Sequence, residues 1–208
     1  MRAIFLSHPH MDHVGGLGNL LWDIRKLNGL ETDPTRQLSG RRLDAFLPDM
    51  EVWEGFMQVL RATEGRFAID FDLEATQYRD GRVFAENGLC VIALHNLHLG
   101  DVAPGNDWRS FSLRAETDDA SLVYSGDIRH ISELDPLIGA GCDLLLAETG
   151  HHQVEEICAH VAEQPVGRLG FLHHGRAILA DPDGELLKAR RFLGDRVFIA
   201  DDGMATDL

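Results

Sequence analysis

The segment from Ser7 to His13 holds three histidines and one aspartate within six positions, and it constrains the chain more than any other feature. Imidazole and carboxylate groups are the ligands of zinc and related divalent ions, and no packing requirement asks for such a cluster. Side chains two apart project to the same side of an extended segment, so His8 and His10 can bind one ion. Asp12 and His13 follow the bend and can face a second ion. The alternative is a cluster of surface histidines without a metal.

The residues on either side of this cluster predict the secondary structure that positions it. The apolar run from Ala3 to Leu6 predicts a buried strand that ends just before the histidines. Gly15 and Gly16 permit a tight turn into a helix from about Leu17 to Asn28. The cluster is therefore expected in the connection between a strand and a helix.

The sequence Ser-His-Pro-His-Met-Asp-His-Val-Gly-Gly-Leu, which begins at Ser7, resembles the HxHxDH signature of the metallo-β-lactamase fold hydrolases. The resemblance implies an α/β fold in which four layers form an αββα sandwich with a metal site at one edge of the paired sheets. It implies a single metallo-hydrolase domain over residues 1–208. Among the branches of this superfamily, the chain looks most like the phosphodiesterases and the transfer-RNA 3′-end endonucleases.

Two later segments resemble the next family motifs in the expected order. The run from Leu122 to Asp127 reads as an apolar strand that ends in Gly-Asp, and the resemblance makes Asp127 a ligand that bridges two metals. A plain turn aspartate after a strand is the alternative. Two histidines compete in the earlier segment that follows the strand near Val91, and the resemblance favours His98 over His95.

The last motif is the run from Arg168 to His174, which reads as a strand with histidines at its exit. Here the resemblance favours His173 over His174 as the final metal ligand. His151 precedes a helical pattern and resembles a non-ligand histidine that donates a proton in the transfer-RNA endonucleases. The usual His-x-Thr has Gln153 at its third place, and a capping or solvated histidine is the alternative.

The resemblance assigns these side chains to two divalent ions, with zinc favoured and manganese or iron as alternatives. The implied first site is His8, His10 and His98, the second is Asp12, His13 and His173, and Asp127 bridges them. A metal pair would supply hydroxide near neutral pH for attack on a phosphodiester or another small ester. Asp12 would also orient the nucleophile, and His151 would protonate the leaving group, because histidine commonly titrates near neutrality.

The loop between His98 and Ser110 is longer than expected for the family and contains Trp108. Trp108 is a candidate wall of the substrate pocket, and a packing tryptophan is the alternative. Two other activities on the same fold stay open, namely a thioesterase or lactonase and an oxidoreductase. A third alternative is a metal-binding or interaction protein without catalytic activity.

Composition limits the partners of the chain. Its 208 residues are 44% hydrophobic, which is enough for a sizeable core. The formal net charge of −15 disfavours nucleic acid, whose binding relies on Lys and Arg. No apolar run reaches the roughly 20 residues of a membrane span. The three cysteines form no paired pattern, which favours a reduced, cytoplasmic protein. The expected partner is a small-molecule ester.

Family members usually carry β-hairpins before the HxHxDH strand, whereas six residues precede Ser7 here. We therefore expect an incomplete first sheet whose exposed edge pairs with a second copy of the chain to form a homodimer, and a monomer with a poorly sealed first sheet is the alternative.

Further along, the apolar pattern predicts a polar loop up to Gly40, a helix from about Glu51 to Thr63 and a strand from Phe67 to Leu73. The remaining strands and helices alternate in a way that suits α/β layers.

Overall fold

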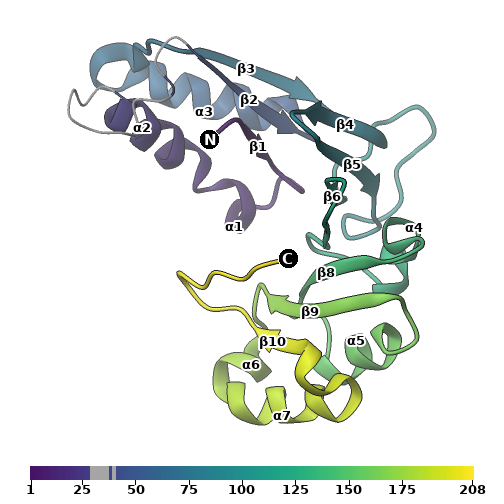
Figure 1. Ribbon diagram of the computed structural model, residues 1–208. Coiled ribbons are helices and arrows are strands. Elements are labelled where there is room, and N and C mark those ends of the chain that lie inside the picture. The colour runs from purple at the N-terminus through teal and green to yellow at the C-terminus, as the bar shows by residue number, and fades with distance from the viewer. Residues whose placement is uncertain (29–37, 39–40) are drawn as a thin grey trace. The chain divides into compact units, whose positions relative to one another are not determined.

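The computed structural model describes residues 1–28, 38 and 41–208, and its chain divides into two compact units, Met1–Tyr78 and Arg79–Leu208 (Figure 1). Each unit has its own β-sheet and its own hydrophobic core. The predicted mixture of helices and strands is confirmed. The prediction of one domain over the whole chain stays a prediction, and the polar loop predicted up to Gly40 lies largely outside the described residues.

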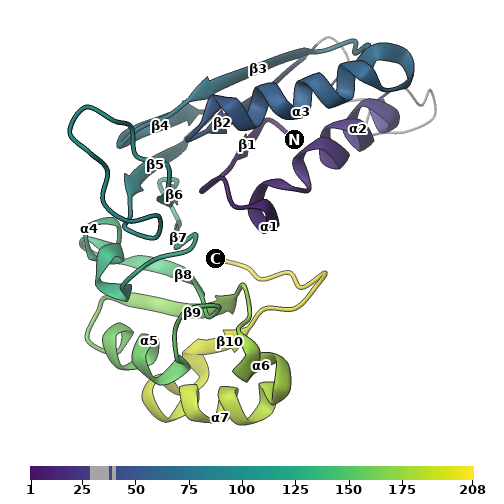
Figure 2. The ribbon, with the colours of Figure 1, turned by 180° about the vertical axis from the view of Figure 1, so that it is seen from behind.

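Unit 1 is a three-stranded parallel sheet with helices along it (Figure 2). The strands follow one another in the sheet in chain order, as β1 (Ala3–Phe5), β2 (Arg42–Leu47) and β3 (Asp72–Gln77). The helices are α1 (Met11–Val14), α2 (Leu17–Asn28) and α3 (Met50–Ala62), and a 3₁₀ helix, η2 (Glu64–Phe67), follows them. Parallel strands need crossover connections, which α2 and α3 provide.

Helix α2 forms where the glycines and the apolar spacing predict it. Its residues Leu17, Leu21 and Ile24 recur at helical spacing and are buried. Helix α3 begins after Asp49, whose carboxylate accepts a hydrogen bond of 2.9 Å from the backbone N–H of Glu51. The buried faces of both helices pack on the sheet and form the core of unit 1.

The predicted strand from Phe67 to Leu73 is wrong over its first five residues. Gly65, Arg66 and Phe67 have positive φ angles of 66°, 50° and 51°, and strand β3 begins only at Asp72. The alternation of apolar residues that suggested a strand has another cause, because Phe67 and Phe71 are buried in the core from irregular backbone.

Unit 2 contains a seven-stranded sheet with the order β10-β9-β8-β7-β6-β5-β4. In chain order the strands are β4 (Gly81–Glu86), β5 (Leu89–His95), β6 (Phe111–Glu116), β7 (Ser121–Tyr124), β8 (Cys142–Glu148), β9 (Val166–Leu172) and β10 (Val197–Ile199). Strands β4 to β7 pair antiparallel, and β7 to β10 pair parallel. Because β5 and β7 are both antiparallel to β6, the strands β5, β7, β8 and β9 all end at the same edge of the sheet.

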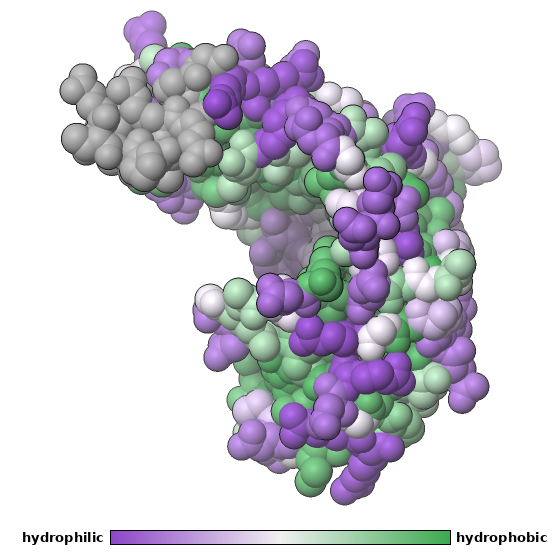
Figure 3. Space-filling model, viewed as in Figure 1, coloured by the Kyte–Doolittle hydropathy of each residue, from purple (hydrophilic) through white to green (hydrophobic). Residues whose placement is uncertain are grey.

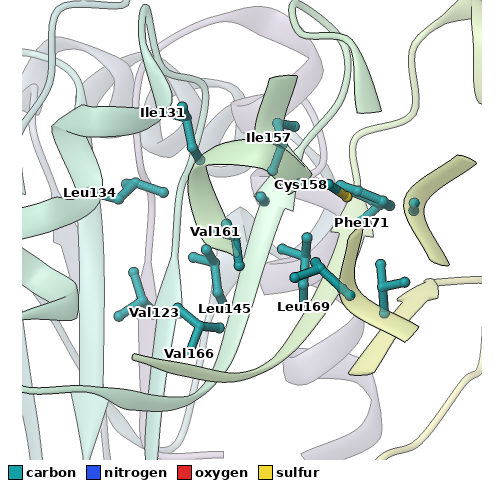
Figure 4. Packing of buried hydrophobic residues seen from close by; sticks show 14 of the residues in the cluster. Val123, Ile131, Leu134, Leu145, Ile157, Cys158, Val161, Val166, Leu169 and Phe171 are labelled. Carbon is teal, nitrogen blue, oxygen red and sulfur yellow. The ribbon is translucent and has the colours of Figure 1, made fainter. Parts of the chain in front are cut away.

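Helices cover one face of this sheet beside β8, β9 and β10 (Figure 1). They are η3 (Ile131–Leu134), α4 (Asp135–Ile138), α5 (Val154–Val161), α6 (Arg176–Ala180), α7 (Pro182–Leu193) and η4 (Gly194–Arg196). In Figure 4, Ile157 and Cys158 of α5 lie against Leu169 and Phe171 of β9, and all four are buried to at least 99%. This packing fixes the ends of β8 and β9, where the candidate site residues follow.

The cysteines of unit 2 are free, and two of them are core residues. Burial raises the pKa of Cys142 to about 11 and that of Cys158 to about 12. Cys142 is therefore a small core residue.

The visible surface of unit 2 is mixed, with hydrophobic residues between hydrophilic ones (Figure 3). Helix α7 contributes Leu187 and Phe192, which are 60% and 43% exposed. Such scattered apolar residues are ordinary on folded proteins. No helix of the described residues has the length and the hydrophobicity to cross a bilayer.

Candidate metal centre

The histidines of unit 1 lie together in the connection that follows β1. The ring centroid of His8 is 4.7 Å from that of His10 and 4.0 Å from that of His13. His8 is fully buried, and its Nδ1 lies 3.1 Å from Oγ of Ser7. Asp12 is 64% exposed, and its carboxylate is 3.6 Å from Nε2 of His13. The sequence cluster is therefore a cluster in space within this unit.

Local backbone structure sets this arrangement. Leu6 extends the pairing beyond β1, because its N–H donates a 3.0 Å hydrogen bond to the carbonyl of Phe46, while its carbonyl accepts one of 2.6 Å from Tyr78 Oη. The chain then turns into α1 at His10, which has an extended φ of −68° and ψ of 147°. The histidines thus leave a fixed strand end and enter a single helical turn.

The predicted ligands of unit 2 surround the carboxylate of Asp127, which follows β7 and is 2% exposed. Its Oδ2 is 3.6 Å from Nε2 of His98, and its Oδ1 is 3.6 Å from Nδ1 of His173. The two oxygens therefore face histidines from two different loops. Donor atoms of Asp127, His151 and His173 all lie within 4.8 Å of one another, a spacing at which they could hold one ion.

The donor distances fit a metal better than a set of direct hydrogen bonds. Zinc binds nitrogen and oxygen at about 2.1 Å, so two ligands on one tetrahedral ion are roughly 3.4 Å apart. The separations of 3.6 Å from Asp127 to His98 and His173 are close to that spacing. They exceed the usual hydrogen-bond range of about 2.7–3.2 Å. Borderline nitrogen and oxygen donors suit zinc, manganese or iron.

The two histidines after the β5 strand have different surroundings. Nδ1 of His95 is 2.6 Å from Oδ2 of Asp80, and its ring stacks on Trp108 with the centroids 4.0 Å apart. The side chain of His98 is 9% exposed and faces Asp127. The geometry supports His98 as the ligand, which stays a prediction. Trp108 contacts His95, and its role in a substrate pocket also stays a prediction.

The two histidines after β9 also differ in their surroundings. His174 lies with Nε2 2.7 Å from the carbonyl oxygen of Ala200, which makes that nitrogen a donor. His173 has a φ of 46° and turns its ring towards Asp127. Gly150 leaves room for this ring, because a Cβ at that position would lie 2.5 Å from Nδ1 of His173. The structure supports His173 over His174.

His151 is held by a buried acid that the sequence analysis did not assign to the site. Glu148, the last residue of β8, is fully buried and accepts a 2.9 Å hydrogen bond from the backbone N–H of His151. Its Oε1 is 3.0 Å from Nδ1 of the same histidine. An imidazole that donates Nδ1–H to Glu148 presents Nε2 outward. The carboxylate thus sets the tautomer and the orientation of His151.

No protein-family model matches this chain. A curated relative, ribonuclease Z of Mycolicibacterium paratuberculosis, is 27% identical over 238 residues, which cover 97% of this chain and 78% of the relative. Other ribonuclease Z proteins from mycobacteria match at similar identity. These relatives support the predicted likeness to the transfer-RNA endonuclease branch.

Solved structures match almost the whole chain. The metallo-β-lactamase fold protein YhfI from Bacillus subtilis aligns with a TM-score of 0.69 and 18% identity over 98% of this chain and 77% of its own. This chain has the metallo-β-lactamase fold. A diphosphatase of the PhnP family aligns with a TM-score of 0.64 and 17% identity over all of this chain and 72% of its own. Zinc-bound PqqB from Methylobacterium extorquens gives 0.63 and 17% over all of this chain and 73% of its own.

The fold predicted from the HxHxDH resemblance is thereby confirmed. Proteins of this fold include metal-dependent hydrolases, such as Tm1679, which aligns with a TM-score of 0.58. The side chains of the present chain that could bind metal are the histidines of unit 1 and the group around Asp127 in unit 2.

Proposed function

We propose that the chain is a metal-dependent hydrolase that acts on a small phosphodiester. The observation that carries the proposal is the carboxylate of Asp127, whose two oxygens face His98 and His173 from two different loops at 3.6 Å each. A carboxylate in this setting can serve two ions at once. The assignment of individual ligands to two ions comes from the sequence resemblance.

Divalent ions bound by these residues would lower the pKa of water and neutralise charge that develops on a phosphoryl oxygen. The side chains of the protein would orient the ions and supply a proton. Asp127 and the ligand histidines would hold the ions, and Glu148 keeps His151 in one tautomer with Nε2 directed away from the carboxylate. In this role His151 donates a proton from Nε2 to the leaving oxygen, and Glu148 stabilises the ring while it is charged.

The negative net charge of the chain favours a small substrate that carries little charge. A net charge of −15 repels long polyanions, because nucleic-acid binding depends on many Lys and Arg contacts to phosphates. A small phosphodiester carries little charge and would meet the metals directly. The name of the curated relatives and the diphosphatase among the solved structures support phosphoryl chemistry for the fold. We propose zinc as the ion, by the chemistry of the donors.

The test uses the full chain loaded with Zn²⁺ or Mn²⁺ after removal of metal by a chelator. Turnover of bis-p-nitrophenyl phosphate is compared with that of a thioester and a lactone. Metal-dependent hydrolysis of the diester alone is the expected result. Thioester or lactone hydrolysis without diester hydrolysis would reassign the substrate. A chain that binds metal but turns over none of the three would favour the non-catalytic alternative.

A matched pair of variants tests the role of Asp127. Asp127→Ala removes both carboxylate oxygens, and diester hydrolysis should fall to background. Asp119→Ala makes the same change at an exposed acid in the turn between β6 and β7 and should leave both metal content and turnover unchanged. Hydrolysis that persists in Asp127→Ala would refute the bridging role.

The proposed assembly is a homodimer that forms across the edge of β1. Within the described residues this strand pairs with β2 on one side, and Ile4 of β1 pairs in register with Ala45. An uncovered strand edge offers backbone groups to another chain. Sedimentation at several protein concentrations should show a dimer in equilibrium with a monomer. A monomer at all concentrations would contradict this proposal.

A further inference from the structure

A chain of buried hydrogen bonds joins the loop of His98 to the loop of Asp127. It runs through Asn96, Ser112 and Ser125, which are 2%, 1% and 0% exposed. Asn96 follows β5, Ser112 lies in β6, and Ser125 follows β7. Three neighbouring strands therefore contribute one residue each.

The backbone fixes which way the amide of Asn96 points. The N–H of His98 lies 3.2 Å from Oδ1 of Asn96 and can only donate, so the oxygen of the amide faces His98. The amide nitrogen then donates a 3.1 Å hydrogen bond to Oγ of Ser112. The hydroxyl of Ser112 in turn donates a 2.6 Å hydrogen bond to the carbonyl oxygen of Ser125. Each donor in this chain has one acceptor.

The series of hydrogen bonds ends at two segments of the candidate site. On one side it holds the backbone of His98, and on the other it holds the segment two residues before Asp127. Ser125 also reaches Glu148, because its Oγ accepts a 3.0 Å hydrogen bond from the backbone N–H of that residue. The segments that carry His98, Asp127 and Glu148 thus share one buried network.

We propose that Ser112 and Asn96 are positioning residues that set the 3.6 Å separation between His98 and Asp127. Their hydrogen bonds join the two residues to each other and to backbone groups, so both act through the backbone of the ligand loops. This inference rests on the proposed function, since it concerns the ions that the site would hold. Groups that orient metal ligands commonly change metal affinity about 10- to 100-fold when they are removed.

A matched control for Ser112 lies two residues earlier in the sequence. Ser110 is also 1% exposed, and its Oγ has no hydrogen-bond partner among the described residues. Ser112→Ala and Ser110→Ala therefore make the same change at the same burial. They differ in whether a hydrogen-bond chain to the site is broken.

The experiment measures binding of Zn²⁺ to the full chain by competition with a chromophoric chelator. Ser112→Ala should raise the dissociation constant about 10- to 100-fold, and Ser110→Ala should leave it unchanged. The visible absorption of bound Co²⁺, which reports coordination geometry, should change in the first variant only. Both readouts are independent of turnover.

A second pair of variants covers the case in which Ser112→Ala does not fold. Ser112→Thr keeps the hydroxyl, Ser112→Val replaces it by a methyl group of similar size, and both suit a strand. The threonine variant should bind Zn²⁺ more tightly than the valine variant. Equal affinities within both pairs would overturn the inference while the proposed function stands. A wild-type chain that binds no Zn²⁺ would overturn both.

Discussion

The substitution Gly150→Ala tests the position of His173 with the smallest change that the chain allows. The added Cβ would lie 2.5 Å from Nδ1 and 2.7 Å from Cε1 of His173, and 3.4 Å from Oε2 of Glu148. Ordinary contacts between such atoms are about 3.5–4.0 Å, so the ring must retreat by roughly 1 Å. Gly150 has no positive φ, and alanine is therefore compatible with its backbone.

A shift of about 1 Å at a catalytic group can cost about 100-fold in rate. Distortion of a metal ligand also lowers metal affinity, and we expect an effect of about 10- to 100-fold. Overall stability should fall by about 1–3 kcal/mol, the usual cost of inserting a methyl group into a packed site. The variant should therefore stay folded while it loses metal and turnover.

The assay combines Zn²⁺ competition, diester turnover and a urea melt on the same preparation. Gly55→Ala is the control, because Gly55 lies in α3 and its added Cβ would have no atom within 4 Å beyond its chain neighbours and the backbone of its own helix. That change should stabilise unit 1 by about 0.5–1 kcal/mol and leave metal binding alone. A Gly150→Ala chain with wild-type affinity for Zn²⁺ would show that His173 is not a ligand where the structure places its ring.

Three further measurements address the other assignments. His98→Gln should lose Zn²⁺ affinity by at least about 10-fold, whereas His95→Gln should retain it; the reverse order would move the ligand to the histidine stacked on the tryptophan. Glu148→Gln should lower kcat about 10- to 100-fold and alter the pH profile of turnover, because His151 loses a charged partner; an unchanged profile would argue against proton donation by this histidine. Thiol labelling of the native chain at pH 8 should modify Cys90 first, since raised pKa values leave the two buried cysteines almost without thiolate; rapid reaction of all three would contradict their burial.

Elements with a strong local signal were predictable from the sequence. Helix α2 begins at Leu17 and ends at Asn28, as the glycine pair and the apolar spacing predict. The signal for this helix is local, because the residues that specify the turn and the buried face all lie within 14 consecutive positions of the sequence. The segment from Phe67 to Leu73 shows the opposite case. Alternating apolar residues fit both a strand and an irregular segment that reaches into the core twice.

The acid behind His151 shows what a local pattern leaves out. Glu148 ends an apolar strand three positions before this histidine, and the sequence alone does not tell whether its carboxylate turns outward or inward. The structure buries it completely, with hydrogen bonds from His151 and a 3.4 Å contact to the backbone N–H of Ile128. A buried carboxylate is costly unless several donors meet it. Those donors come from two loops, and only the fold brings them together.

The choice between His95 and His98 depends on the same kind of distant partner. Both follow an apolar strand, and both are chemically able to bind a metal. Asp80, 15 residues earlier, engages His95 through its ring and through its backbone N–H at 2.6 Å each. An imidazole whose Nδ1 is held in this way is oriented towards its carboxylate. His98 is instead held by its backbone, through Asn96, so its ring is available to Asp127. The prediction of His98 as the ligand therefore rests partly on the hydrogen bonds that hold His95 elsewhere.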